Sequence, residues 1–148
     1  MRCAWLIAFF LPLSAAAQEY ADTNPLAQQW DAWLRGKRLT QIHSYSSGSS
    51  GGTQSRADLF LCRDGTFLYT RSGSTSITVP GASGSSARSS KDRGSWRIVS
   101  NGRIVALEVA PESAGGQKSY HDLSRTPDGK TFMGRERTFV TDENKVCS

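Results

Sequence analysis

The segment Leu59-Phe60-Leu61-Cys62-Arg63-Asp64-Gly65-Thr66-Phe67-Leu68-Tyr69 consists of two apolar, β-prone runs joined by Arg-Asp-Gly. A glycine in such a turn adopts the positive φ that tight hairpins require, because it has no Cβ. The segment therefore predicts a β-hairpin. The same pattern recurs at Asn101-Gly102 and Asp128-Gly129, which indicates further hairpins downstream.

Short β-prone segments separated by turn residues occur on both sides of this hairpin. Many short strands, each joined locally to the next, are typical of an antiparallel meander, and closing the meander into a barrel removes its exposed edges. We therefore predict an all-β, up-and-down barrel of about eight strands. Only Gly134 separates the last two segments, so they are either two strands or one bent strand. The predicted strands are Arg38–Tyr45, Ala57–Cys62, Thr66–Arg71, Gly94–Ser100, Arg103–Val109, Lys118–Arg125, Lys130–Met133 and Arg135–Thr141.

One short amphipathic helix is predicted ahead of the strands. Asn24 is a candidate N-cap, Pro25 suits the first helical position, and Gly36 is placed to end the helix. An aromatic stripe at helical spacing could form a ligand-binding face, but it more often packs on a core, which is the interpretation we adopt. The stripe consists of Leu26, Trp30, Trp33 and Leu34.

Residues 1–17 have the features of a secretory signal peptide, with Arg2 as the only charge and an apolar run from Ala4 to Leu13. This run is too short to span a bilayer. We therefore predict a secreted or periplasmic, soluble monomer without a transmembrane segment. The predicted organisation is a signal peptide (1–17), an N-terminal segment with the helix (18–37) and one β-barrel domain (38–148).

Cleavage of the signal peptide removes Arg2 and no acid, so the formal net charge falls from +5 to +4. That charge favours anionic partners only weakly, and it is too dilute to predict a nucleic-acid-binding surface. The same cleavage removes Cys3 and leaves Cys62 and Cys147 in a chain bound for an oxidising compartment, which favours a disulfide between them. A reactive thiol or a metal site is the competing reading, although His43 and His121 would be the only histidine ligands.

If each strand reverses direction, the connections alternate between the two ends of the barrel. The three tight Gly turns then fall at one end, together with the helix and both cysteines. The long segments 46–55, 72–93 and 110–117 fall at the other end, and the first two are rich in Ser and Gly, which predicts loops. Function carried by such loops on a rigid scaffold is expected at this open end, but the loops can equally be solvated and without a role.

Gly94-Ser95-Trp96 on a meander strand, with a short helix in front, resembles the lipocalin and avidin group of β-barrels, the calycins. In lipocalins the Gly-x-Trp motif lies on the first strand and its Trp packs beneath a basic residue near the last strand. Here the motif lies on the fourth predicted strand, so that role is not transferred, although Arg135 or Arg137 could lie near Trp96. The resemblance implies a barrel that binds a small ligand or a protein.

Two binding hypotheses follow. In the first, a small ligand occupies the barrel mouth, and the candidate residues on the strands are Phe67, Tyr69, Arg71, Trp96 and Ile98. In the second, the 72–93 loop acts as a wedge against a partner protein, such as a secreted hydrolase that it inhibits. The candidate residues of this loop are Ile77, Val79, Arg88, Lys91 and Arg93.

No catalytic, metal or cofactor site is predicted. The serines lie in low-complexity segments without a Gly-x-Ser-x-Gly elbow. His121 and Asp122 are the best candidate base and acid, but adjacent strand residues point to opposite faces. An enzyme of unknown class remains a third hypothesis, and substitution of these two residues would test it.

Overall fold

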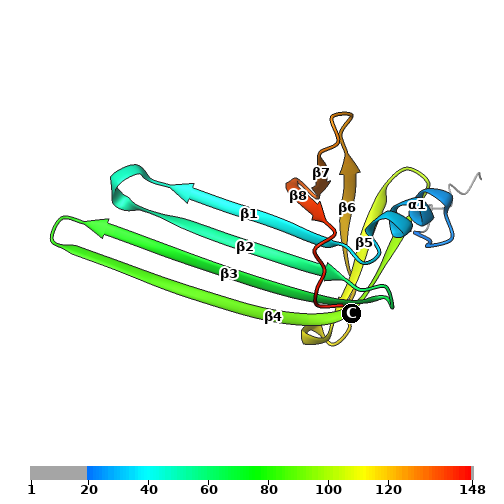
Figure 1. Ribbon diagram of the computed structural model, residues 1–148, viewed down its shortest axis with the longest axis horizontal. Coiled ribbons are helices and arrows are strands. Elements are labelled where there is room, and N and C mark those ends of the chain that lie inside the picture. The colour runs from blue at the N-terminus through cyan, green and yellow to red at the C-terminus, as the bar shows by residue number, and fades with distance from the viewer. Residues whose placement is uncertain (1–19, 148) are drawn as a thin grey trace, which may run out of the picture.

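The computed structural model describes residues 20–147, with Ser49 described by its backbone only, and the strands close into an antiparallel barrel (Figure 1). The predicted signal peptide, residues 1–17, lies outside these residues. The barrel confirms the all-β, eight-strand prediction and is compatible with a calycin-like fold. The elements are α1 (Pro25–Leu34), β1 (Arg38–Ser46), η1 (Gly48–Ser50), β2 (Gly51–Leu61), β3 (Thr66–Val79), β4 (Ala82–Ser100), β5 (Val105–Pro111), η2 (Glu112–Ala114), β6 (Ser119–Arg125), β7 (Thr131–Met133) and β8 (Glu136–Thr141).

The helix α1 begins and ends as its sequence predicts. Oδ1 of Asn24 accepts a hydrogen bond of 2.9 Å from the Leu26 N–H, which caps the helix. Its inner face packs on the barrel, because Leu34 is fully buried and both Trp30 and Trp33 contact the core. The packing interpretation of the aromatic stripe is therefore confirmed for Trp30, Trp33 and Leu34, whereas Leu26 is 36% exposed. Within the described residues, the structure has no helix with the length and hydrophobicity of a membrane span.

The Cys62–Gly65 turn joins β2 and β3 as a tight hairpin. Gly65 has a φ of +86°, and the Cys62 N–H donates to the Thr66 carbonyl at 2.8 Å. The Asp64 carboxylate accepts from both the hydroxyl and the N–H of Thr66, and these bonds hold the pKa of Asp64 below its usual range. The sequence left open whether the segments on either side of Gly134 form one strand or two. Met133 pairs with Glu136 across Gly134 and Arg135, so β7 and β8 are two strands.

The predicted loops 46–55 and 72–93 are wrong in large part. β2 begins at Gly51, β3 continues to Val79, and β4 starts at Ala82. Strand pairing uses backbone N–H and C=O groups, which Ser-rich and Gly-rich segments also possess, so polarity alone does not predict a loop. The pairing of β2 with β3 also requires a glycine at position 51. Its φ is +121°, and an added Cβ would lie only 2.0 Å from the Ser76 carbonyl oxygen.

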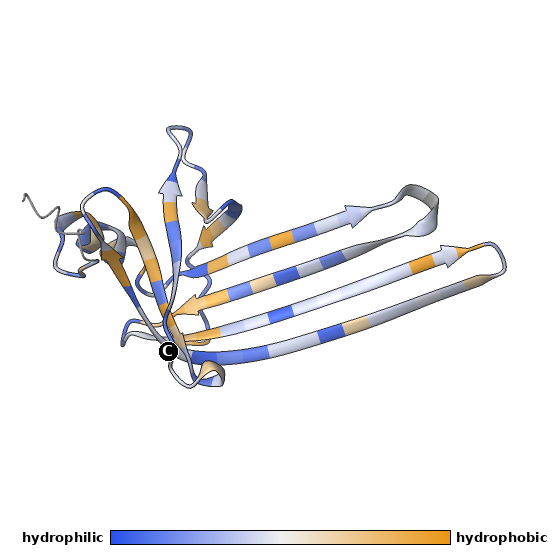
Figure 2. Ribbon diagram, turned by 180° about the vertical axis from the view of Figure 1, so that it is seen from behind, coloured by the Kyte–Doolittle hydropathy of each residue, from blue (hydrophilic) through white to orange (hydrophobic). Residues whose placement is uncertain are grey.

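These extensions form a projecting four-stranded sheet, which we call the arm (residues 42–46, 51–56, 70–79 and 82–91). Figure 1 shows the arm extending far beyond the barrel as a single layer, with β1 and β4 at its two edges. Its apolar residues are few and exposed, whereas apolar residues are concentrated in the barrel (Figure 2). Of the three long loops expected at this end, only the one between β5 and β6 is present, over residues 112–118, whereas residues 47–50 and the Pro80-Gly81 turn are short connections.

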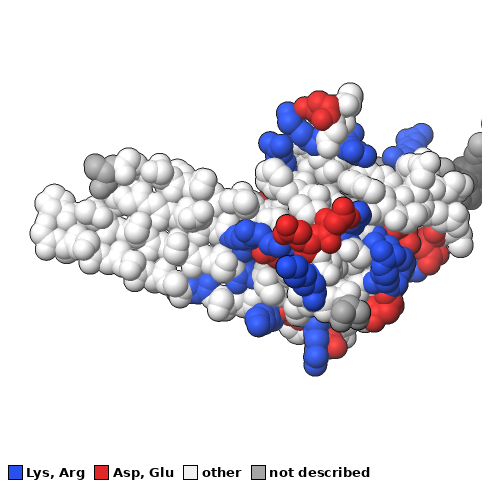
Figure 3. Space-filling model, in the orientation of Figure 1, with Lys and Arg blue, Asp and Glu red and all other residues white. Residues whose placement is uncertain are grey.

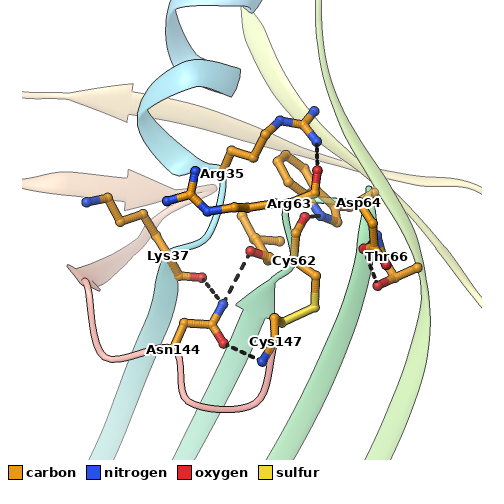
Figure 4. Close-up of a disulfide and its surroundings, with 10 residues drawn as sticks. Arg35, Lys37, Cys62, Arg63, Asp64, Thr66, Asn144 and Cys147 are labelled. Atoms are coloured by element: carbon orange, nitrogen blue, oxygen red, sulfur yellow. Dashed lines mark hydrogen bonds between the residues drawn. A yellow bond between two sulfur atoms is a disulfide. The ribbon is translucent and has the colours of Figure 1, made fainter.

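The Cys62–Cys147 disulfide, drawn in Figure 4, joins the end of β2 to the C-terminal segment at the end of the barrel opposite the arm. The Asn144 side-chain amide donates to the Lys37 and Leu61 carbonyls at 3.4 and 3.3 Å, and its Oδ1 accepts from the Cys147 N–H at 3.2 Å. The predicted disulfide is thus confirmed, and the C-terminal segment is attached to the start of β1 and the end of β2. This disulfide is compatible with an extracellular location.

Candidate functional site: the barrel cavity

A cavity of about 570 Å³ lies inside the barrel where the arm leaves it. Inward-facing residues alternate along every strand, so residues from the strands around the barrel share this space. Its walls are apolar toward the barrel core and polar toward the mouth. The lining residues are Leu39, Gln41, Ala57, Leu59, Phe67, Tyr69, Asp92, Val109, Pro111, Ser119, His121, Met133, Gly134, Arg135 and Glu136.

The five predicted ligand residues are divided among three places. Phe67 and Tyr69 line the cavity. Trp96 and Ile98 point inward as well, but they are only 4% and 1% exposed and belong to the packed core beneath it. Arg71 lies beyond Tyr69 on the arm and borders a shallow groove there. The structure therefore brings two of the five residues together at the cavity.

Trp96 contacts the Cys62 carbonyl and Arg35 rather than the cavity. Its Nε1 donates to the Cys62 carbonyl at 3.1 Å, and the Arg35 guanidinium lies 4.9 Å from the centre of its ring. The basic residue over this tryptophan is therefore Arg35, which follows α1. Arg137 lies over Phe139, and Arg135 lines the cavity mouth.

The mouth of the cavity carries both charge signs. Glu136 Oε2 lies 2.9 Å from His43 Nε2, and Arg135 adjoins Glu136 in the turn after β7. The Ser113 hydroxyl donates to Asp92, which lowers the pKa of that carboxyl below its ordinary value. Asp92 is therefore ionised at neutral pH, and the rim offers a carboxylate, a guanidinium and several neutral hydrogen-bonding groups.

His121 faces the cavity, while Asp122 is on the outer side of β6, as strand alternation predicts. The His121 Nε2 lies 3.4 Å from Ser119 Oγ. Among the described residues no carboxylate forms a hydrogen bond to His121, so this pair lacks the third, orienting group of a nucleophilic triad. Within residues 20–147, no three His, Cys, Asp or Glu side chains gather in a way that would ligate a metal ion.

The residues predicted for a partner-binding loop lie on strands. Ile77 and Val79 end β3 and are 57% and 49% exposed, and Arg88 shares their face of the arm. Lys91 and Arg93 lie on the opposite face of β4, and Arg93 pairs with Glu112 at 3.0 Å. Figure 3 shows that the charged side chains gather around the barrel and the base of the arm, whereas the outer arm is uncharged on this face.

The predicted ligand residues do not include most of the polar rim, such as Gln41, Asp92 and Glu136. The period-two alternation that selected Phe67 and Tyr69 also places Gln41 beside Leu39 and Asp92 beside Gly94 on the inward face. That signal was present, but residue 92 was assigned to a loop. No family model, curated protein or solved structure matches this chain.

Proposed function

We propose that this chain is a secreted or periplasmic binding protein, related in architecture to the calycins, that holds a small ligand in its barrel cavity. The observation that carries the proposal is the cavity of about 570 Å³, which falls within the size range of small-molecule sites in proteins. No catalytic step is assigned to it.

The lining supports a ligand with an apolar body and one polar end. Leu39, Leu59 and Val109 surround the inner part of the cavity together with Phe67, so an apolar group gains free energy by leaving water there. Arg135 and Asp92 lie at the mouth, where a polar end group can form charge-assisted hydrogen bonds while staying partly hydrated.

The experiment is native mass spectrometry of protein purified from its own source, followed by ligand displacement with 1-anilinonaphthalene-8-sulfonate. The expected result is a retained small molecule whose release accompanies the increase in dye fluorescence. Ala57→Phe fills the cavity and is expected to reduce dye binding at least tenfold. Ala87→Phe, on the arm and outside the cavity, is the matched control and is expected to bind the dye normally.

Both variants are first compared with the unsubstituted protein by thermal melts. Equal dye binding by Ala57→Phe and Ala87→Phe, with unchanged melting temperatures, would show that the cavity is not the binding site.

A further inference from the structure

The outer edge of β4 between Ala82 and Lys91, which we call the β4 edge, has no strand beside it in the part of the chain that the structure describes. Along this length β4 pairs only with β3, and β5 joins it from Gly94 onward. In Figure 1, β4 is the outermost strand of the arm on its side. A long edge of this kind presents a row of free backbone donors and acceptors.

The hydrogen bonds of β4 show which of its backbone N–H and C=O groups point away from β3. The Trp96 N–H donates to the Gly65 carbonyl at 2.8 Å and the Ser100 N–H to the Ala21 carbonyl at 2.9 Å, both on the side of β4 where β3 lies. The direction of the backbone groups alternates along a strand. The N–H and C=O groups of even-numbered residues of β4 therefore point toward β3, and those of odd-numbered residues point outward. The outward donors of the β4 edge belong to Ser83, Ser85, Ala87, Ser89 and Lys91.

Arg93 marks where the β4 edge ends. Its outward N–H is accepted by Oδ1 of Asp92 at 2.8 Å, so this donor is occupied by the neighbouring side chain. From Gly94 the same side of β4 is covered by β5. Between the tip of the arm and this point lie five outward donors in uninterrupted register with β3, enough for a bound segment of about ten residues in extended conformation.

The charged side chains of the β4 edge are all positive. Residues 66–91 contain no Asp or Glu, while Arg88 and Lys91 project from opposite faces of β4. Two β4 edges from two copies of the chain would bring like charges together, which disfavours self-pairing. A strand bearing carboxylates on both faces would instead place them across from Arg88 and Lys91.

We propose that the β4 edge binds an extended, acidic segment of a partner protein as an additional strand of the arm. Backbone hydrogen bonds to the outward residues supply the attraction common to all sequences, and Arg88 and Lys91 select for acidic side chains. This surface is separate from the barrel cavity, so it is a second binding site of the chain.

The first test is a fluorescence anisotropy titration with a fluorescein-labelled peptide that repeats Glu-Glu-Thr-Thr, which places carboxylates on both faces of an extended strand, and with its counterpart that has Lys in place of Glu. The acidic peptide is expected to bind at least tenfold more tightly than the basic one. Arg88→Gln with Lys91→Gln is expected to remove most of this difference. Equal affinity for the two peptides overturns the proposal.

Two proline variants test the edge itself. Ser89→Pro removes one outward donor, and proline is tolerated on a strand edge, so binding should weaken at least tenfold. Ser44→Pro is the matched control on the other free edge of the arm: the Lys37 carbonyl accepts from Leu61, so odd residues of β1 face β2 and Ser44 faces outward. Its affinity should stay within twofold of the unsubstituted protein, and equal weakening by both prolines overturns the assignment to β4.

Amide hydrogen exchange of the unsubstituted protein tests the geometry without any substitution. On addition of the acidic peptide, the amides of Ser85, Ala87 and Ser89 should exchange at least tenfold more slowly, while those of Ser86 and Arg88 stay unchanged. Protection without this alternation overturns the proposal. Alternating protection that appears without peptide and grows with protein concentration, together with a dimer in sedimentation, would identify a second copy as the occupant and also overturn it.

Discussion

The barrel and the arm are built from the same strands, yet they are stabilised differently. In the barrel half of β3 and β4, the side chains of Phe67, Trp96 and Ile98 are almost completely buried. In the arm half of the same two strands, the pairing continues in unbroken register, but Ile77 is 57% and Val79 is 49% exposed. Hydrophobic burial stabilises the barrel, whereas the arm depends on backbone hydrogen bonds and on its attachment to the barrel.

The difference shows that strand formation and core formation are separate requirements. A strand needs a neighbour whose backbone groups are in register, and the barrel supplies that register at the base of the arm. A core needs apolar side chains on a shared face, and these end near Tyr69. Perturbations of the barrel should therefore change global stability, and perturbations of the arm should change local properties only.

The largest expected effect on stability comes from Cys62→Ser with Cys147→Ser. Loss of a cross-link over 85 residues costs about 4–5 kcal/mol in the chain-entropy description, and engineered cases often give about half of that. The melting temperature of the double variant, or of the reduced protein, should fall accordingly. Amide exchange at Ser86 and Arg88 in the arm should keep its rate, because the arm opens locally.

Free thiols in the purified protein, detected by alkylation and mass spectrometry, would contradict this prediction, as would an unchanged melting temperature on reduction. Slower or faster exchange in the arm after reduction would show that the two regions are coupled.

The second effect compares one aliphatic truncation in each region. Leu107→Ala removes a fully buried side chain from the barrel and should cost about 3 kcal/mol, through lost burial and the cavity left behind. Ile77→Ala removes an exposed side chain from the arm and should change the free energy of unfolding by less than about 0.5 kcal/mol. Urea denaturation measures both; comparable losses would mean that the arm has a core of its own.

The same contrast explains what the sequence predicts and what it does not. The apolar alternation around Leu59–Tyr69, the Asp-Gly turns, the helix with Asn24 and Pro25, and the cysteine pair all predict local structure, and the structure confirms them. The arm carries no apolar alternation, since Ser, Thr and Gly occupy both faces. Only its position as a continuation of β2, β3 and β4 specifies a strand, and that information is tertiary.

The cavity was predictable in part for a related reason. Strand parity selects Phe67 and Tyr69 as inward residues, but parity alone does not say how deep a residue lies, so Trp96 and Ile98 were grouped with them. The depth of an inward-facing residue depends on its distance along the strand from the end of the barrel. Arg71 lies on the same face of β3 as Phe67 and Tyr69, but the barrel wall ends before it and the arm begins.

The third effect concerns a buried charge on the outer wall of the barrel. The Glu108 side chain is 6% exposed, and it accepts hydrogen bonds from Arg97 Nε and Nη2 at 2.8 and 3.0 Å. These bonds lower the pKa of Glu108 below its usual value, and Lys118 reinforces the shift. Glu108→Gln should therefore cost about 1–2 kcal/mol at neutral pH.

The pH dependence has a definite sign. Because the folded pKa of Glu108 is depressed, its contribution is complete above the ordinary glutamate pKa of about 4.3 and is lost as the pH falls through the folded value. The stability difference between the unsubstituted protein and Glu108→Gln should shrink on acidification. Glu112→Gln, an exposed partner of Arg93 at the base of the arm, is the control and should cost less than about 1 kcal/mol at every pH.

The smallest expected effect on stability is the removal of the arm itself. The register permits two clean cuts: His43 faces Ser55, and Arg71 faces Ser90, each as a pair whose backbone groups point at one another. Residues 44–54 and residues 72–89 are each replaced by Asn-Gly, which suits a two-residue hairpin turn. The barrel should then unfold cooperatively with a free energy within about 1 kcal/mol of the full chain, because the removed side chains bury little apolar surface.

The shortened protein should also separate the two proposed sites. Its cavity keeps all of its lining residues, so dye binding should persist, whereas the acidic peptide should no longer bind because the β4 edge is gone. Hairpins of this polarity are only marginally stable by themselves, so the barrel supports the arm and the reverse dependence is weak. A loss of several kcal/mol on truncation would contradict this order of dependence and would indicate that the arm is part of the folding unit.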